Sequence, residues 1–175
     1  MDLKQIPKNI HRIYILGGPG SGKTYLANIL SKQLKIKSFD LDDIVFEIKY
    51  TAKRAETERA KILKRIHSGK RWIIEGAYTR QWVYDALQKS DIIILLDFPI
   101  TTTIYRTILR EIHRQQKNNL KNFLELLRYG ITYKNSRIKE RKIIPRFKSK
   151  LIIIKNKNQV EKLIQALQKP QSKHF

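Results

Sequence analysis

The feature that most constrains this chain is the octapeptide Gly-Gly-Pro-Gly-Ser-Gly-Lys-Thr at residues 17–24, which fits the pattern G-x-x-x-x-G-K-[ST]. A short apolar run at residues 10–16 precedes it, and apolar residues at helical spacing follow it between residues 26 and 34. Strand, glycine loop and helix form the context that this motif requires. Glycines leave backbone N–H groups free to surround phosphate oxygens, and the helix N-terminus adds partial positive charge. The sequence therefore predicts a phosphate-binding loop.

Each residue of this loop is expected to contact a bound nucleotide. The set is Gly17, Gly18, Pro19, Gly20, Ser21, Gly22, Lys23 and Thr24. Lys23 is expected to reach the β- and γ-phosphates, and the hydroxyl of Thr24 is expected to contact a magnesium ion. Lys23 is therefore a candidate catalytic residue, and Thr24 is a candidate metal ligand.

Length and composition exclude several classes of protein. The 175 residues suffice for one domain with its own core, so we expect a single domain over 1–175. The absence of cysteine excludes disulfides, thiolate metal sites and a cysteine nucleophile. No apolar run approaches the roughly 20 residues of a membrane span, and the N-terminus lacks the apolar core of a signal peptide. We expect a cytoplasmic monomer or homodimer that does not contact a membrane.

The net charge of +22, from 37 Lys and Arg against 15 Asp and Glu, is the unusual feature of the composition. Such an excess is typical of nucleic-acid-binding proteins. We favour two simpler origins for this charge. Lysine is spread along the whole chain among isoleucine and asparagine, as a genomic base bias would produce, and a site for polyanionic nucleotides also needs surrounding positive charge.

Five short apolar strands alternate with helical patterns along the chain. The expected strands are residues 10–16, 36–39, 71–74, 92–97 and 151–154. This alternation predicts an α/β fold with an open parallel sheet covered by helices on both faces.

Helices are expected where apolar residues recur at helical spacing. They cover residues 52–66, 82–87, 101–118, about 120–145 with a break at Gly130, and 160–167. Asn158 and Glu161 resemble a capping box for the last of them, with asparagine in place of serine or threonine.

Polar residues follow several of the strands. Ligands of parallel α/β sheets bind beyond the carboxyl ends of the strands. The phosphate-binding loop and residues 40–43, 75–80, 97 and 155–158 all fall there. We therefore expect one shared site.

The carboxylates at these strand ends have two expected roles. Glu75 and Asp97 each follow an apolar strand and compete for the role of metal ligand. Asp40 and Asp42 are candidate acceptor-binding residues that would accept a hydrogen bond from an acceptor hydroxyl and assist its deprotonation. An N-cap for the next helix is the alternative for either aspartate.

Two sets of arginines are candidates for stabilising transferring phosphate. Arg106, Arg110 and Arg114 recur every four residues and span roughly 12 Å of helix, the scale of a polyphosphate chain. Arg137 and Arg141 form a second pair at the same spacing. A basic stripe of this kind is also typical of plain solvated surface, so the functional interpretation depends on the adjacent triphosphate site.

Residues 156–159, Asn-Lys-Asn-Gln, approach the N-K-x-D pattern of GTPases, but glutamine stands where the guanine-reading aspartate belongs. No D-x-x-G follows any strand, which argues against a GTPase switch. This loop can still pass over a nucleotide base, so Asn156 is a candidate nucleotide contact.

Taken together, these residues make the chain resemble the adenylate-kinase-like P-loop kinases and, more narrowly, the topology modulation proteins. The resemblance covers residues 12–167. Its marks are the loop at 16–24, Leu41-Asp42, Trp72-Ile73-Ile74-Glu75-Gly76-Ala77-Tyr78, Leu96-Asp97-Phe98-Pro99 and the arginine helix from Tyr105-Arg106 to Arg110. The third and fourth of these marks are much more restrictive than the loop itself.

The resemblance implies a five-stranded sheet of order 2-3-1-4-5, with ATP and Mg²⁺ at the loop and a small helical lid. The acceptor-binding region would cover about 40–69, and the lid about 114–136. Glu75 matches the position of the aspartate that follows the third strand in adenylate kinases, which favours it over Asp97. Arg80 lies one residue from their acceptor-phosphate arginine. Arg106 and Arg110 match the first lid arginines, and Arg137 and Arg141 match the pair after the lid.

Two functions are compatible with these features. The first is a kinase that moves the γ-phosphate of Mg-ATP to a small hydroxyl or phosphate acceptor, with Glu75 and Arg80 also contacting the acceptor. The second is a nucleic-acid-associated nucleotide-binding protein that affects DNA topology, or a polynucleotide 5′-kinase. The second ranks lower because the basic stretches contain neither a DNA-reading motif nor regular aromatic interleaving.

Overall fold

The structure, a computed structural model, describes residues 6–7, 9–48, 52–113 and 144–168. The predicted lid at 114–136, Arg114, Arg137 and Arg141 lie outside the described residues. None of the described helices is long and apolar enough to cross a membrane.

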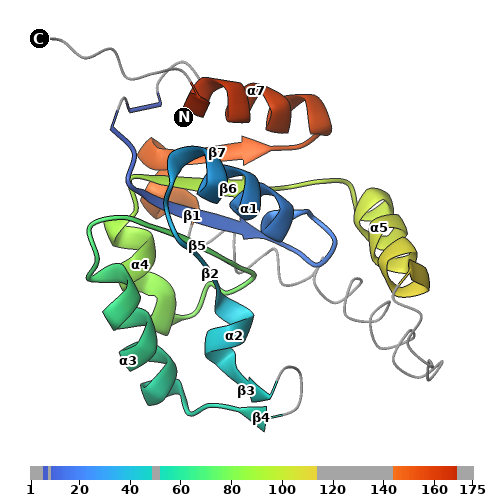
Figure 1. Ribbon diagram of the computed structural model, residues 1–175. Helices are drawn as coiled ribbons and strands as arrows, with labels where there is room; N and C mark the ends of the chain where they lie inside the picture. The colour runs from blue at the N-terminus through green and yellow to red at the C-terminus, as the bar shows by residue number, and fades with distance from the viewer. Residues whose placement is uncertain (1–5, 8, 49–51, 114–143, 169–175) are drawn as a thin grey trace, which may run out of the picture.

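A five-stranded parallel sheet organises the described chain (Figure 1). Its strands are β1 (Arg12–Gly17), β2 (Ser38–Asp40), β5 (Trp72–Gly76), β6 (Ile92–Leu96) and β7 (Leu151–Ile154). They lie in the order β2-β5-β1-β6-β7. Counted along the chain, these five strands have the order 2-3-1-4-5, so the predicted topology is confirmed.

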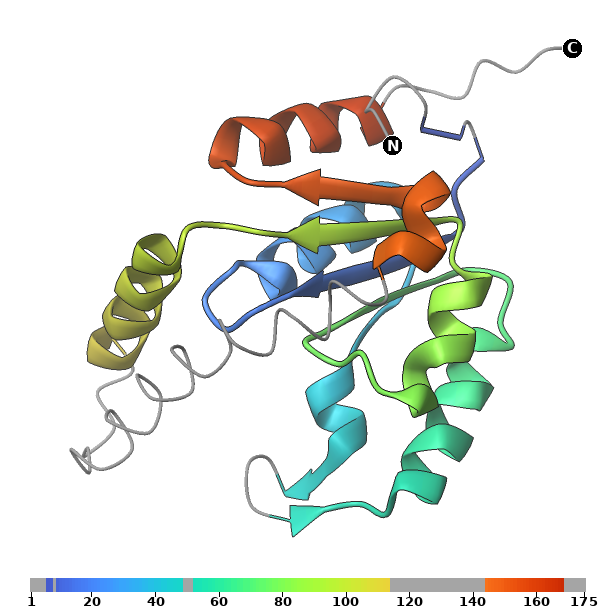
Figure 2. The same cartoon turned by 180° about the vertical axis from the view of Figure 1, so that it is seen from behind.

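Helices cover both faces of the sheet, as Figures 1 and 2 show from opposite sides. On one face lie α1 (Lys23–Leu34) and α7 (Lys157–Gln168); on the other lie α2 (Leu41–Val45), α3 (Glu56–His67), α4 (Tyr84–Lys89) and two 3₁₀ segments, η2 (Gln81–Val83) and η3 (Ile144–Lys150). The helix α5 (Ile100–His113) follows β6 and lies beyond the carboxyl ends of the strands (Figure 1). The three-layer architecture predicted from the sequence is present.

The alternation of side chains along β1 shows how one strand supplies two cores. Ile13 and Ile15 pack with α1 and α7, whereas Tyr14 and Leu16 pack with the helices of the opposite face. All four are almost fully buried. A strand that is covered on both faces must be apolar on both faces, which is why this strand could be recognised from an unbroken apolar run.

The predicted helix over 52–66 is wrong at its start. Ala52 belongs to a small antiparallel pair formed by β3 (Phe46–Ile48) and β4 (Ala52–Lys53), and α3 begins only at Glu56. The backbone N–H of Arg54 donates to the carbonyl of Val45 at 2.9 Å, which fixes this return of the chain. The alanine spacing that suggested a helix here is overridden by this long-range pairing.

The predicted cap of the last helix is also wrong by two residues. The Oδ1 atom of Asn156 accepts from the backbone N–H of Gln159 at 3.0 Å, and α7 begins at Lys157. Asn158 therefore lies inside the helix. Asparagine at the earlier position satisfies a first-turn amide equally well.

Candidate functional site

The glycine loop joins β1 to α1 at the carboxyl edge of the sheet, as predicted. Gly20 and Gly22 have φ angles of 69° and 90°, in the left-handed region that favours glycine. No side chain caps the N-terminus of α1, and its first turn contains no acidic residue. The helix dipole therefore favours an anion at the N-terminus of this 12-residue helix.

Lys23 lies at the start of α1 and reaches back over the loop. Its Nζ atom donates to the carbonyl of Gly18 at 3.1 Å. The ammonium group is thus held above the turn whose amides would bind phosphate. A bound phosphate and this lysine would be brought together by the loop itself.

Space inside the loop is tightly limited. A Cβ atom on Gly17 would lie 2.7 Å from Ser21 Oγ and 3.0 Å from the carbonyl oxygen of Leu96. Ser21 is 2% exposed, and its Oγ atom has no hydrogen-bond partner within the described chain. A buried hydroxyl without a partner is costly, and a phosphate oxygen would satisfy it.

Gly20 is in direct contact with α5. A Cβ atom there would overlap the backbone carbonyl of Thr103 and would lie 2.6 Å from Thr107 Oγ1. Thr107 in turn donates to the Thr103 carbonyl at 2.8 Å. The phosphate-binding turn and the arginine-bearing helix are therefore packed together at this glycine.

This contact gives a matched pair of predictions, because Gly22 also has a positive φ but no atom within 4 Å of its Cβ position. Gly22→Ala should cost about 1–2 kcal/mol of unfolding free energy, from the left-handed backbone alone. Gly20→Ala should cost roughly 1–3 kcal/mol more, because its methyl group must displace α5. Chemical denaturation measures both values. Equal losses in the two variants would contradict the packing of α5 on the loop.

Glu75 is the buried carboxylate of the site. It lies on β5, 3% exposed, and in the sheet register it pairs with Ile15 on β1 and Asp40 on β2. Burial raises its pKa above the ordinary value, and the charges of Asp40 and Asp42 add to this; a hydrogen bond from Thr24 and the charge of Lys23 oppose it. The loop residues Lys23 and Thr24 and the carboxylate of Glu75 are thus gathered at one point.

Asp97 lies on the other side of β1. It directly follows β6, and its backbone N–H donates to the carbonyl of Ile154 at 2.8 Å. Thr24 is among the neighbours that influence the pKa of Glu75. The choice between Glu75 and Asp97 as the metal ligand stays a prediction.

Among the described residues there is no cluster of three or more His, Asp or Glu side chains that could hold a metal ion alone. Mg²⁺ at phosphate sites commonly uses one or two carboxylates, together with substrate oxygens and waters. Thr24 and Glu75 fit that donor set. A metal held there would be shared with a nucleotide phosphate.

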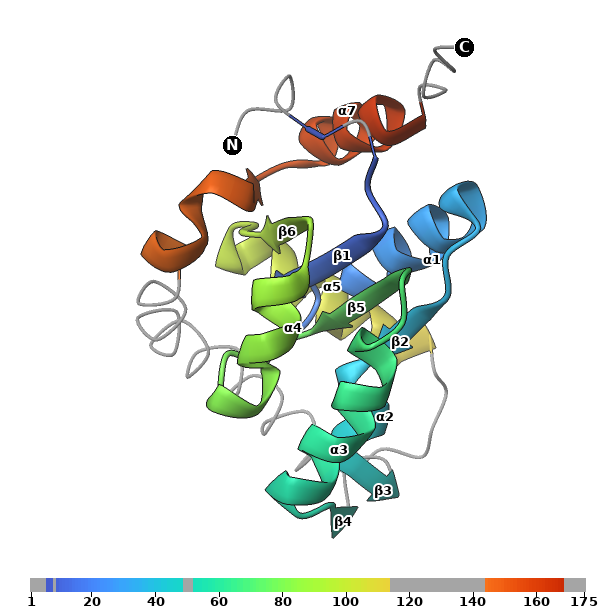
Figure 3. The ribbon, with the colours of Figure 1, turned by 90° about the vertical axis from the view of Figure 1, so that its left-hand side faces the viewer.

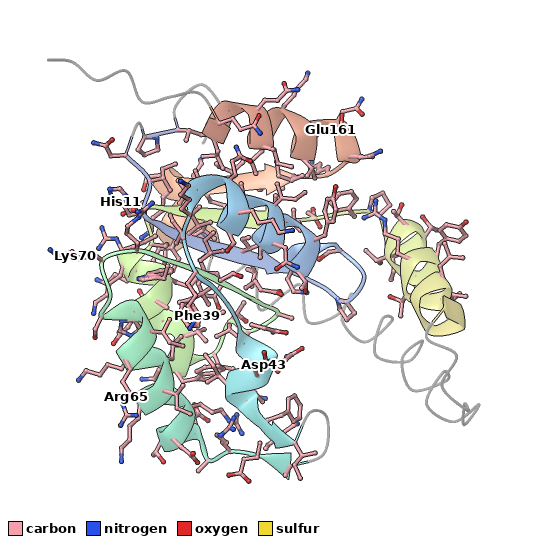
Figure 4. The ribbon with its side chains drawn as sticks, viewed as in Figure 1. His11, Phe39, Asp43, Arg65, Lys70 and Glu161 are labelled. Carbon is pink, nitrogen blue, oxygen red and sulfur yellow. The ribbon has the colours of Figure 1, made fainter. Side chains whose placement is uncertain are left out.

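The start of α2 brings the acceptor candidates together (Figure 4 labels the neighbouring Asp43). Asp40 caps this helix by accepting from the backbone N–H of Asp42 at 2.8 Å, so the N-cap alternative holds for Asp40. The hydroxyl of Tyr78 donates to Asp42 Oδ1 at 2.7 Å. Tyr14 Oη donates to the carbonyl of Tyr78 at 3.0 Å and holds that residue against β1. The carboxylate of Asp42 is therefore oriented by tyrosines beside the glycine loop.

Two arginines near this point, Arg54 and Arg80, differ in their surroundings. The Nη1 atom of Arg54 donates to three backbone carbonyls at the end of α2, those of Asp43, Ile44 and Phe46, at 2.8, 3.0 and 2.6 Å. Arg54 therefore stabilises the turn into β3. Arg80 is exposed and lies just before η2, so its proposed contact with an acceptor stays a prediction.

A cavity of about 290 Å³ lies beside the loop, at the low end of the range for small-molecule sites. Its wall includes Ser21, Tyr25, Phe98, Arg106, Lys157 and Val160. The guanidinium of Arg106 lies over the ring of Phe98, 4.7 Å from its centroid. Arg110 lies one turn further along α5, but its side chain is outside the described part of the structure.

The side chain of Asn156 caps α7, and the cavity wall on this side contains Lys157 and Val160. The contact of Asn156 with a nucleotide stays a prediction. Sequence reasoning missed Tyr14, Tyr25 and Tyr78. Of these, Tyr78 is part of a restrictive motif, which was the one signal that could have identified it.

With this geometry established, the chain can be compared with known proteins. No protein-family model matches it. The protein YqaC of Bacillus subtilis (strain 168), itself described as uncharacterized, is 33% identical over 108 residues, which are 61% of this chain and 58% of YqaC. The match thus spans about 58% of that relative's length.

Solved structures match over almost the whole chain. A shikimate kinase from Bacteroides thetaiotaomicron is 17% identical, with a TM-score of 0.56, over 91% of this chain and 97% of its own. A shikimate kinase from Acinetobacter baumannii, in complex with shikimate, has the same identity and TM-score over 94% and 93%. A gluconokinase from Sinorhizobium meliloti 1021 is 12% identical, with a TM-score of 0.54, over 90% and 91%.

At these identities the likeness shows the fold. The chain has the fold of P-loop kinases of the adenylate-kinase type, as the sequence motifs predicted. The narrower resemblance to topology modulation proteins stays a prediction.

Proposed function

We propose that this protein is a kinase that transfers the γ-phosphoryl group of Mg-ATP to a hydroxyl of a small acceptor. The observation that carries the proposal is the junction of Lys23, Thr24 and the buried Glu75 at the loop, with Asp42 on the adjoining helix. A phosphate cradle, a cation, a metal-side carboxylate and a hydrogen-bond acceptor for the substrate are the parts that phosphoryl transfer requires.

Each part has a stated task in this proposal. The amides of the loop and Lys23 bind the β- and γ-phosphates, and Thr24 and Glu75 hold the magnesium ion, which when bound neutralises developing negative charge. Asp42 accepts a hydrogen bond from the acceptor hydroxyl and takes its proton as the oxygen bonds to the γ-phosphorus. The bond from that phosphorus to the bridging oxygen breaks at the same time, and ADP leaves.

The cavity beside the loop is assigned to the nucleotide base. It adjoins Ser21 and Gly22 of the loop, so a base and a triphosphate on the loop would be continuous. The guanidinium of Arg106, which lies over the buried ring of Phe98, offers a flat cationic surface to a purine. A basic and aromatic wall of this kind recognises the shape of a purine more than its hydrogen-bonding edge.

A hydroxyl acceptor is favoured over a phosphate acceptor by the charges on the acceptor side. The side chains of Asp40, Asp42 and Glu75 are all near this point, and the guanidinium of Arg54 is bonded to backbone carbonyls. Carboxylates bind hydroxyl groups well and repel a phosphate. The matched folds include kinases named for shikimate and gluconate, both polyhydroxylated, which supports the same class here.

A panel of acceptors tests this proposal directly. Purified protein with magnesium and γ-³²P-labelled ATP is incubated with hydroxy acids, polyols, sugars, nucleosides and nucleoside monophosphates. We expect transfer to at least one hydroxyl acceptor at a rate well above transfer to water. Equal rates with every acceptor and with water would overturn the proposal, and transfer to the phosphate of a nucleoside monophosphate would overturn the hydroxyl class.

Asp42→Asn is expected to lower kcat by about 10²-fold, the low end for a general base, because the loose transition state of phosphoryl transfer needs little activation of the nucleophile. Tyr78 can still donate to the remaining amide oxygen, so the fold should be kept. Asp43→Asn is the matched control, since Asp43 is the exposed neighbour on α2. A similar loss of kcat in both variants would show that Asp42 has no special role.

A further inference from the structure

The opposite edge of the sheet, where the strands begin, has a charge pattern that the kinase proposal does not use. Because the five strands are parallel, the chain enters all of them at the same edge, which faces the viewer's left in Figure 1. Arg12 begins β1, Lys37 and Arg71 directly precede β2 and β5, and Lys150 directly precedes β7. Lys89, at the end of α4, lies shortly before β6.

We call the residues that lead into each strand its entry segment. We define the basic edge as six exposed residues in these segments: Lys35, Lys37, Lys70, Arg71, Lys89 and Lys148. Figure 4 labels Lys70 and the adjacent His11 at this end of the sheet. Within the described parts of the entry segments, Asp91 is the single carboxylate, and it is neutralised by Arg12, whose Nη2 atom lies 2.7 Å from Asp91 Oδ1.

The two edges of the sheet differ in composition. At the carboxyl edge the carboxylates of Asp40, Glu75 and Asp97 accompany the cations around the glycine loop, whereas cations predominate where the strands begin. Helix C-termini attract basic residues, which explains Lys89 at the end of α4 and Lys35 at the cap of α1. Arg71 also contacts a helix end, because its Nη2 atom donates at 2.8 Å to the carbonyl of Leu34, the last residue of α1. Lys37 and Lys70 lie beyond the helix ends, so this effect does not explain them.

The size and chemistry of the basic edge fit a polyphosphate backbone. Neighbouring strands lie about 4.8 Å apart, so five strands span roughly 19 Å. This span is comparable with the width of a DNA duplex. The end-on view in Figure 3 shows the starts of the strands along this edge. Cations spread over such a distance can contact several phosphates at once.

The exposed apolar side chains of the described chain distinguish between a nucleic-acid duplex, a single strand and a membrane as the polyanion that the basic edge would bind. The large exposed ones are Tyr25, Ile48, Tyr105 and Ile153, and none lies in an entry segment. Single strands are bound by stacking bases on aromatic rings, and membrane surfaces by inserting apolar side chains. The basic edge has neither feature, which leaves contact with the phosphates of a duplex.

We propose that the basic edge binds the phosphate backbone of duplex nucleic acid without sequence preference. The surface lies at the end of the sheet opposite the glycine loop, so nucleic acid and nucleotide can be bound at the same time. The proposal is independent of the kinase activity, since neither site contributes residues to the other.

The test compares two triple variants that remove equal charge. The edge variant is Lys37→Gln, Lys70→Gln and Lys148→Gln; the control is Lys53→Gln, Lys61→Gln and Lys162→Gln, three exposed lysines on other surfaces. Lys37 and Lys53 each lie over a phenylalanine ring, at 5.2 and 5.8 Å, so the two sets also match in this contact. Surface changes of this kind shift stability by roughly 0.5 kcal/mol or less, so both proteins should fold.

Fluorescence anisotropy with a labelled 25-base-pair DNA duplex, from 50 to 300 mM NaCl, measures binding. We expect the edge variant to bind at least tenfold more weakly than wild type at 100 mM NaCl, with the slope of log K against log[salt] reduced by about 0.9 for each lysine that contacts a phosphate. The control should lose less than threefold. Equal losses in the two variants, no binding by wild type, or tighter binding to a single strand or to phosphatidylserine vesicles would each overturn the proposal.

Discussion

Lys23→Ala is expected to lower kcat/KM for phosphoryl transfer by about 10³-fold. Its ammonium group lies over the glycine loop, bonded to the carbonyl of Gly18, and it is the cation closest to the phosphates in our proposal. Removing one charge-stabilising donor from a preorganised site costs about 10²–10³ in rate, and a full positive charge belongs at the upper end of that range. Steady-state kinetics with the preferred acceptor measure the loss.

The control for this substitution is Lys32→Ala, on the same helix. Lys32 is exposed in the last turn of α1, far from the loop. It should retain wild-type kinetics to within about twofold, because one distant surface charge is screened by salt. If Lys23→Ala transfers phosphate and binds ATP as well as this control does, the loop is not the phosphate site.

Glu75→Gln is expected to lower kcat/KM by about 10²–10³-fold and at the same time to raise thermal stability. Glutamine keeps the shape and can still accept the hydrogen bond from Thr24, but it cannot supply negative charge to a magnesium ion. The loss of activity should be largest at low magnesium concentration. A magnesium titration of both proteins at saturating ATP measures this dependence.

The difference in stability between Glu75→Gln and wild type depends on pH, and the raised pKa of Glu75 gives its direction. Burial raises the pKa of Glu75 above its ordinary value of 4.5, so the folded protein binds the proton more tightly than the unfolded chain does. The stability that protonated Glu75 contributes is complete below pH 4.5 and is lost as the pH rises through the raised pKa of the folded state. Glutamine does not titrate in this range. The melting temperature of Glu75→Gln should therefore exceed that of wild type above the raised pKa and converge with it at lower pH.

Calorimetry from pH 4 to pH 8 without nucleotide checks this prediction. A 1 kcal/mol change corresponds to roughly 2–4 °C for a chain of this size. Adding Mg-ATP should reverse the order of the two melting temperatures, because the wild-type carboxylate then has a metal partner. A wild-type protein more stable than the variant at neutral pH without ligand would show that Glu75 is stabilised by a permanent partner.

The parts of this fold that could be predicted from the sequence are those that a contiguous run of residues determines. The loop at 17–24 combines glycine spacing with Lys23 and Thr24, and each apolar strand is an unbroken run. The order of the strands followed from the resemblance to kinases of known topology. The β3–β4 pair could not be found in this way, because its strands are two and three residues long and Ile48 is exposed.

The site was predicted less completely, because its contacts join residues that are distant in sequence. Tyr78 and Asp42 are 36 residues apart, and nothing local to either one indicates their hydrogen bond. Glu75 and Asp97 both follow apolar strands next to β1, so the pattern alone could not separate them. The two carboxylates lie on strands on opposite sides of β1, so which of them faces a metal ion at Thr24 is a property of the packed structure.

The most direct measurement of the central claim is a crystal structure of the protein with magnesium and a non-hydrolysable ATP analogue. Our account predicts β- and γ-phosphates within hydrogen-bond distance of the loop amides and Lys23, a magnesium ion near Thr24 and Glu75, and the base in the cavity beside Phe98 and Arg106. An analogue bound elsewhere while the loop contains no phosphate would contradict the account.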